Sequence, residues 1–271
     1  MHFFYKEILH INTVHLDRQV IVDVLLPPDY ATSNLYYKVL YLNDGQDLEQ
    51  LRLAYILSEL LHRRRIQPIV VVAIHANSDR HHEYGTAVMT DYKKRGGRSG
   101  AYSLFVTTEL IPLVCQKYRV LLGAANTVIA GCSLGGLSAF DMAWRFPEWF
   151  GKTGVFSGAF WWRSKDLLDP NYTDQDRIMH RVVRNSLKRE GLKFWFQTGT
   201  WDEIDDRNQN GIIDSIDDTL DLIAELRNKR YSMGVDIRYV QIDGGRHDQQ
   251  TWAVAMPDFL KWAFGKDAPD R

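Results

Sequence analysis

Apolar and polar residues follow the periods of strands and helices along most of the chain. Residues 38–42 (KVLYL) and 69–74 (IVVVAI) are short apolar runs without alternation, which predicts central strands covered on both faces. Residues 19–26 (QVIVDVLL) predict another strand, and Pro27-Pro28 ends it. The remaining predicted strands are 126–131, 152–156, 192–198 and 235–242.

Segments with helical spacing separate these runs. Apolar residues in 48–64 recur at mostly helical intervals, and 101–118 is amphipathic with an expected kink at Pro112. Strands that alternate with helices indicate the α/β class, with a mostly parallel central sheet and helices on both faces. No repeat or linker interrupts the pattern, so a single domain over 1–271 is expected. Further predicted helices are 134–146, 218–230 and 252–264.

Composition and charge exclude several classes of protein. The chain has 33 Lys and Arg against 34 Asp and Glu, and 45% of its residues are hydrophobic, as in soluble globular proteins. Near-neutral charge argues against a nucleic-acid partner, and the longest apolar runs are too short to span a membrane. The N-terminal residues resemble no secretory leader, which favours a cytoplasmic location. Cys115 and Cys132 alone do not suggest a disulfide framework.

The segment Gly131-Cys132-Ser133-Leu134-Gly135-Gly136 carries the strongest chemical signal. It matches the G-x-S-x-G nucleophile elbow and lies between a predicted strand and a predicted helix, as that motif requires. The turn would expose the Ser133 hydroxyl at a helix N-terminus, where backbone N–H groups favour negative charge. The alternative is a glycine-rich turn with an incidental serine; the strand–turn–helix setting favours a nucleophile.

A nucleophilic serine needs a base and an orienting carboxylate, which follow it along the chain in the order acid, histidine. His247 lies in a glycine-rich loop after the last predicted strand, whereas His180 lies in a polar, helical stretch. Asp202 follows the preceding strand, with Glu203 and Asp205 as alternatives because loop register is not readable from sequence. We therefore expect Ser133, Asp202 and His247 to form a catalytic triad.

An oxyanion hole requires two backbone N–H groups aimed at the tetrahedral oxygen. Leu134, which follows the nucleophile, is expected to supply one of them. The loop after strand 38–42 reads Asn43-Asp44-Gly45-Gln46-Asp47. Gln46 is the expected second donor and Asp47 the alternative, although the loop by itself also suits a plain Asp-Gly turn.

These motifs resemble the esterase D/enterochelin-esterase-like (putative esterase) family of α/β hydrolases. The similar stretches are LPPDY (26–30), VLYLNDGQ (39–46), R-x-x-E-Y (80–84), DYKKRG…ELIP (91–112), GCSLGG (131–136), FSGAFWW (156–162), QTGTWDE (197–203) and GGRH…W (244–252). The resemblance implies an α/β-hydrolase fold and a serine carboxylesterase with its triad at Ser133, Asp202 and His247. It also implies a small-molecule ester substrate, such as a siderophore, feruloyl or acetyl ester or S-formylglutathione, and no cofactor for catalysis.

Position along the chain suggests residues for the substrate pocket. Trp161 and Trp162 follow a strand on the catalytic side and are candidates for stacking on an aromatic acyl group or a sugar ring. Glu83 and Tyr84 lie beyond strand 69–74, at the same expected edge. Core packing is an equal alternative for the tryptophans. The basic loop 93–98 suits a solvated loop, or a lid that attracts an anionic substrate.

Residues 206–217 (DRNQNGIIDSID) resemble an EF-hand calcium loop inserted in the hydrolase, with Asp in place of the final Glu. Oxygen-bearing side chains fall at positions 1, 3, 5, 9 and 12 with glycine at 6, so that alternate residues can face one cation. A structural Ca²⁺ is expected, with Mg²⁺ as the alternative cation and an Asx-rich turn as the metal-free alternative. The expected ligands are Asp206, Asn208, Asn210, Asp214, Asp217 and the Ile212 carbonyl.

The sequence thus favours a Ser-His-Asp esterase. A non-catalytic binding module on the same fold is the alternative from another class. The complete triad in the right order favours the esterase, because a binding role would not require all three residues. Thioesterase or peptidase activity is the alternative within the fold. The acyl group, the alcohol and the oligomeric state are left open.

Overall fold

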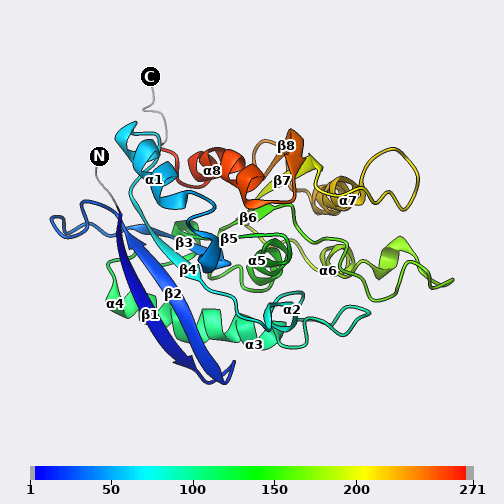
Figure 1. The fold of residues 1–271 in the computed structure, drawn as a ribbon, viewed down its shortest axis with the longest axis horizontal. Helices are drawn as coiled ribbons and strands as arrows, with labels where there is room; N and C mark the ends of the chain where they lie inside the picture. The colour runs from blue at the N-terminus through cyan, green and yellow to red at the C-terminus, as the bar shows by residue number, and fades with distance from the viewer. Residues whose placement is uncertain (1–3, 267–271) are drawn as a thin grey trace.

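The computed structural model describes residues 4–266, and an eight-stranded sheet forms its centre (Figure 1). The strand order is β1-β2-β4-β3-β5-β6-β7-β8. β1 and β2 run antiparallel to their neighbours, whereas β3 to β8 are parallel. The strands are β1 (Tyr5–Thr13), β2 (Arg18–Leu26), β3 (Lys38–Asn43), β4 (Ile69–Ile74), β5 (Thr127–Cys132), β6 (Lys152–Phe156), β7 (Lys193–Trp201) and β8 (Ile237–Arg246).

Helices cover both faces of this sheet, as the sequence predicts (Figure 1). On one face Val39 and Tyr41 of β3 join a core with α3 to α7; on the other Leu40 and Leu42 join a core with α1 and α8. The main helices are α1 (Leu53–His62), α3 (Ser99–Leu104), α4 (Ile111–Lys117), α5 (Leu134–Arg145), α6 (Ile178–Asn185), α7 (Asp214–Asn228) and α8 (Gln249–Phe264), with the short α2 (Arg80–Glu83). Among the described residues no helix is both long and apolar enough to cross a membrane.

The structure differs from the prediction in three parts of the chain. β1 is absent from the sequence expectation because its residues are exposed or half-buried along most of its length. β7 and β8 run beyond their predicted ends, since Gly199 pairs with Ile242 and, after a register shift, Trp201 pairs with Arg246. Instead of a break at Pro112, a π-helical turn over Phe105–Leu110 joins α3 to α4, consistent with proline removing one helical N–H.

The parallel strands place several chain segments at one edge of the sheet. Ser133 follows β5, Ser157 follows β6, Asp202 follows β7 and His247 follows β8. Because these four strands are consecutive neighbours in the sheet, their carboxyl ends meet at one edge, where open α/β sheets bind ligands.

Candidate active site

Ser133 occupies a strained turn between β5 and α5. Its φ and ψ angles are 55° and −123°, a conformation that residues with a β-carbon rarely adopt. A β-carbon on Gly131 would lie 2.3 Å from the Gly135 oxygen, and one on Gly136 would lie 2.9 Å from the Gly131 oxygen. Strand and helix therefore meet too closely for larger residues, and this is the geometry of a nucleophile elbow.

Two backbone N–H groups near this turn are open to a ligand. Within residues 4–266, neither the Leu134 nor the Gln46 N–H donates to an acceptor, whereas the Asp47 N–H donates to the Asp44 oxygen at 2.9 Å. The Gln46 side chain stabilises its loop, since Nε2 donates to Asp44 Oδ1 (3.2 Å) and Oε1 accepts from the Ala76 N–H (3.0 Å). This favours Gln46 over Asp47 as the second oxyanion donor.

A partly buried ion pair joins Arg80 to Asp44, in the loop that contains Gln46. Asp44 has a left-handed backbone, and Arg80 Nε and Nη2 donate to its two carboxylate oxygens at 2.7 and 2.8 Å. The Asp44 N–H donates to the Tyr84 hydroxyl at 3.2 Å. A β-carbon on Gly135 would lie 2.5 Å from Asp44 Oδ2, so this pair sits directly against the first turn of α5. Arg80 thus brings a positive charge close to Ser133.

Asp202 is buried, and its carboxylate is held by two donors. Ser157 Oγ donates to Oδ1 at 3.0 Å and the Gly199 N–H donates to Oδ2 at 2.9 Å. Desolvation raises the pKa of Asp202, and these two hydrogen bonds and the nearby charge of His247 oppose the rise. Of the three acids considered, Asp202 is the one whose carboxylate raises the pKa of His247.

The two alternative acids lie differently. Burial raises the pKa of Glu203 to about 7, and the carboxylates of Asp214 and Asp205 add to that rise. Asp205 is exposed to solvent. The charge of Asp202, by contrast, acts on His247, which supports Asp202 as the candidate acid.

His247 packs edge-on against Trp252 of α8, with ring centroids 5.3 Å apart and planes at 80°. Desolvation lowers the pKa of His247, the Asp202 carboxylate raises it, and Arg80 lowers it further. The charges of both Asp202 and Arg80 therefore act on the imidazole. In the described part of the chain it makes no hydrogen bond or ion pair with Ser133 or Asp202. Catalytic hydrogen bonds are often long before substrate binds.

Three of the four side chains expected to line the pocket are buried instead. Glu83 accepts two hydrogen bonds from Arg18, at 2.8 and 2.6 Å, and Tyr84 contacts the Asp44 loop. Trp162 is fully buried. Because these side chains present almost no surface to solvent, the expectation of direct substrate contact is corrected.

Trp161 differs from its neighbour because it is only half-buried. Arg95 stacks on both rings, 5.0 Å from the centroid of Trp161 and 5.3 Å from that of Trp162. Arg95 also forms an ion pair with buried Asp91, so this part of the basic loop is anchored, while Lys93 and Lys94 are exposed. Trp161 remains the candidate for contact with substrate.

The loop 206–217 brings together four of its predicted ligand side chains. Asp206 accepts the N–H groups of Asn210 and Gly211 at 3.2 and 2.9 Å. The side-chain amides of Asn208 and Asn210 donate to Asp217 Oδ2 at 3.0 and 2.8 Å. A compact loop of Asx turns thus forms, with its oxygen-bearing side chains facing one another.

Asp214 does not join this group, which corrects one predicted ligand. It is the first residue of α7, and the Arg207 guanidinium and N–H donate to it at 2.9 and 3.0 Å. Ile212 has a partly exposed side chain, and no role of its carbonyl is evident. Across residues 4–266 no group of three or more Asp, Glu, His or Cys side chains is arranged to hold a metal ion. The metal in this loop therefore stays a prediction.

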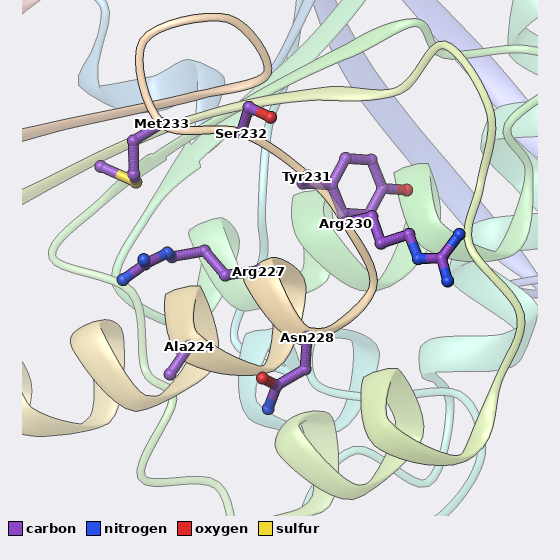
Figure 2. Close-up of a pocket in the computed structure, with 7 residues that line it drawn as sticks. All are labelled: Ala224, Arg227, Asn228, Arg230, Tyr231, Ser232 and Met233. Atoms are coloured by element: carbon purple, nitrogen blue, oxygen red, sulfur yellow. The ribbon is translucent and has the colours of Figure 1, made fainter.

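A hollow of about 640 Å³ lies away from this edge (Figure 2). It lies where α7 ends and the chain leads into the amino end of β8, whereas Ser133 and His247 lie at the carboxyl ends of their strands. The hollow is therefore separate from the candidate active site. Its lining residues are Ala224, Arg227, Asn228, Arg230, Tyr231, Ser232 and Met233.

Sequence reasoning did not single out Arg80, Ser157 or Trp252. Arg80 begins the R-x-x-E-Y segment, but its contact with Asp44 joins residues 36 positions apart. Ser157 and Trp252 lie inside the quoted segments FSGAFWW and GGRH…W. The segments themselves were the available signal; the side chains that reach the site became evident only from the folded chain.

Comparison with known proteins places this geometry in a family. A family model described as "Putative esterase" matches residues 13–263. Over 199 residues the chain is 28% identical to the iron(III) enterobactin esterase of Escherichia coli (strain K12), a match that covers 73% of this chain and 42% of that protein. Over 262 residues it is 25% identical to the protein YjcH of Bacillus subtilis (strain 168), covering 96% and 94% of the two chains.

Solved structures share the fold. An enterobactin esterase from Shigella flexneri, determined in the presence of enterobactin, superposes with a TM-score of 0.75 at 24% identity, over 96% of this chain and 59% of that chain. A ferulic acid esterase has a TM-score of 0.73 at 19% identity, over 97% and 99% of the two chains. The chain spans about half the length of the first curated relatives, with 56% of Bacillus subtilis YbbA and 42% of the Escherichia coli esterase matched. On the match over residues 13–263, the chain belongs to the putative esterase family.

Proposed function

We propose that this protein is a serine carboxylesterase that works through an acyl-enzyme at Ser133. The observation that carries the proposal is the backbone of Ser133, with φ 55° and ψ −123° at the start of α5. This strained turn exposes a hydroxyl at a helix N-terminus, and strain of this kind concentrates at functional sites. The family match and the esterase relatives support the same reaction class.

In the proposed reaction, His247 removes the proton from Ser133 Oγ as the oxygen attacks the ester carbonyl. The protonated imidazole then gives that proton to the leaving alcohol, and water repeats the sequence to release the acid. Asp202 stabilises the imidazolium that forms between the two proton transfers. The Leu134 and Gln46 N–H groups stabilise the oxyanion, to which a single donor typically contributes about 10²–10³ in kcat.

The proposed substrates are esters with a small acyl group or with an aromatic ring near the scissile bond, such as siderophore, feruloyl or acetyl esters. Half-buried Trp161 supports an aromatic group, because the Ala159 N–H donates to the Ser133 carbonyl at 3.1 Å and so holds this segment beside the nucleophile. Arg80 and exposed Lys93 and Lys94 favour anionic substrates. Relatives named for enterobactin and for ferulic acid are consistent with either choice.

The test combines active-site labelling with turnover. Wild-type protein should react with a fluorophosphonate probe and hydrolyse members of a panel of p-nitrophenyl and methyl hydroxycinnamate esters. Ser133→Ala should lose both properties while keeping its melting temperature. Ser232→Ala, at the separate hollow (Figure 2), is the matched control and should keep both. Labelling and turnover by Ser133→Ala would contradict the proposal, and a wild-type protein that binds esters without labelling or turnover would indicate a binding module.

For the loop 206–217 we propose a structural Ca²⁺, with Mg²⁺ as the alternative cation. Asp206, Asn208, Asn210 and Asp217 would supply side-chain oxygens, after rotation of the two amides that now donate to Asp217. Arg207 competes for Asp214, so the set is smaller than the sequence pattern suggests. The cation would stabilise the segment that leads from Asp202 into α7 and would not contact the ester.

A further inference from the structure

The hydroxyl of Ser157 connects the candidate catalytic acid to helix α8. Ser157 is 1% exposed, and its Oγ donates to Asp202 Oδ1 at 3.0 Å. The same oxygen accepts the indole N–H of Trp252 at 3.0 Å. Because an indole nitrogen can only donate, this contact occupies an acceptor site of the hydroxyl and directs its proton toward the carboxylate.

The backbone conformation of Ser157 would suit glycine better than serine, which indicates that the hydroxyl has a role. Its φ angle is 43°, in the left-handed region where glycine has no steric penalty and other residues do. The Ser157 N–H donates to the Gln197 oxygen at 2.8 Å, which ties this turn to β7. A glycine would relieve the strain but would remove the donor to Asp202.

Trp252 contacts the other side of the same pair. Its ring meets the His247 ring edge-on at 5.3 Å, while its N–H donates to Ser157. It is 5% exposed and belongs to α8, whose first turn Asp248 caps by accepting the Thr251 N–H. One rigid side chain therefore touches the histidine directly and the acid through one hydroxyl.

We propose that Ser157 and Trp252 are positioning residues that orient Asp202 and His247 for proton transfer. With Ser157 on Oδ1 and the Gly199 N–H on Oδ2, each oxygen of the carboxylate accepts one hydrogen bond, which fixes the orientation of its plane. Trp252 restricts the rotation of the imidazole. This proposal rests on the proposed esterase function, and it assigns the two residues no contact with substrate.

The first experiment is a double-mutant cycle with Ser157→Ala and Asp202→Asn. A hydrogen bond to a charged group is typically worth 1.5–3 kcal/mol, so Ser157→Ala should lower kcat/KM by about tenfold or more. In the Asp202→Asn background the same substitution should have little further effect, because its target is already altered. A multiplicative loss in the double variant would overturn the proposal.

The pH profile supplies a readout that a purely structural role would not change. The Ser157 hydrogen bond lowers the pKa of Asp202, so its removal should let this carboxylate take up a proton at higher pH. Loss of the carboxylate should then move the acidic limb of kcat/KM, which His247 otherwise sets, to higher pH. Other groups that face this pair are Tyr239 on β8, Ser215 on α7, and Arg80 and Asp248 around His247. They are unchanged in the variant, so an unmoved limb would count against the proposal.

Two further variants keep the test decisive. Ser157→Gly removes the hydroxyl and relieves the backbone strain, so activity should fall while the melting temperature does not. Trp252→Phe keeps a ring against His247 but lacks the N–H, and should reduce activity less than Ser157→Ala. Trp262→Phe makes the same change on α8 beside Lys152 and should leave activity unchanged.

If Ser157→Gly loses activity only in proportion to lost stability, Ser157 has a structural role alone and the proposal is overturned. If Ser133→Ala keeps full activity, the proposed acyl-enzyme at Ser133 fails, and if the wild-type protein hydrolyses no ester, the esterase function itself fails.

Discussion

At the scale of single residues, the candidate site contains three non-glycine residues with positive φ angles. Ser133 and Ser157 end the adjacent strands β5 and β6 with φ of 55° and 43°, and Asp44 follows β3 with φ of 61°. None of the three is a glycine, and each carries a side chain with a partner or a proposed role at this edge. Backbone strain of about 1–3 kcal/mol per residue persists only where the surrounding structure enforces it.

Arg80 should set the pH range of activity. Catalysis by His247 requires the neutral imidazole, and desolvation and Arg80 lower its pKa against the opposing effect of Asp202. The acidic limb of kcat/KM should therefore lie below the ordinary histidine pKa of about 6.5. Arg80→Gln removes a positive charge and exposes the Asp44 carboxylate, so the limb should move to higher pH. Arg80→Lys is the control that keeps the charge, and its limb should stay closer to wild type. An unchanged limb in Arg80→Gln would contradict this role.

At the scale of elements, the carboxyl ends of the parallel strands β7 and β8 carry both the proposed acid and the proposed base. Their last pair, Trp201 with Arg246, directly precedes Asp202 and His247. The approach is so close that a β-carbon on Gly199 would lie 2.3 Å from the Gly245 oxygen and 2.9 Å from Asp202 Oδ1. Backbone atoms cannot move aside as the end of a flexible side chain can. The close approach of Gly199 to Gly245 therefore depends on glycine at position 199.

Gly199→Ala should therefore reduce both stability and activity. Overpacking of this kind typically lowers the free energy of unfolding by about 1–3 kcal/mol. Displacement of Asp202 should reduce kcat and change KM less. Thermal melts and steady-state kinetics measure the two effects. Gly97→Ala is a matched control because its β-carbon would meet only Thr90 Cγ2, at 3.9 Å. Equal behaviour of the two variants would show that β7 and β8 can separate without loss.

The loop 206–217 and α7 form a second element whose stability should depend on a cation. If Ca²⁺ binds, it should stabilise the native state by about 2.7 kcal/mol at a hundredfold excess over its dissociation constant. EDTA should lower the melting temperature, and activity should fall only secondarily, through a looser Asp202. Asp206→Ala should abolish the response to Ca²⁺ or Mg²⁺, whereas Asp169→Ala, in another Asx turn, should keep it. Identical wild-type melts with and without EDTA and added cation would leave the loop a metal-free turn.

At the scale of the whole molecule, buried polar groups tie the helices to one another. His180 of α6 is 1% exposed and its Nε2 contacts the Asp218 carbonyl of α7 at 2.8 Å. Arg177 and Arg207 both pair with the buried Asp218 carboxylate, at 2.7 and 2.9 Å. Burial lowers the pKa of His180 to about 3, and the nearby Arg177 adds to the effect. This histidine is therefore neutral in the folded protein.

The stability of the fold should accordingly fall in acid. The unfolded chain binds a proton at His180 below pH of about 6.5, whereas the folded chain does so only near its own pKa, about 3. Between these values the free energy of unfolding should lose about 1.4 kcal/mol per pH unit from this residue. The difference between His180→Gln and wild type, measured by denaturant titration from pH 4 to 7, should show this slope. His82→Gln, at an exposed position, should match wild type, and parallel curves for His180→Gln and wild type would refute the prediction.

The sequence by itself determined the features that depend on short stretches of chain. Runs such as IVVVAI specify buried parallel strands, and Gly131, Gly135 and Gly136 specify the sharp turn at Ser133, because local sterics act between neighbours in the chain. Tertiary structure decided what depends on residues far apart. It buried Glu83, Tyr84 and Trp162, paired Asp214 with Arg207, and placed the Ser157 hydroxyl on the Asp202 carboxylate. It also brought Ser157 and Trp252 together across 95 positions of chain. Which side chains are buried and paired depends on which surfaces the packed helices cover. Because this packing involves residues from the whole chain, it cannot be read from any short segment.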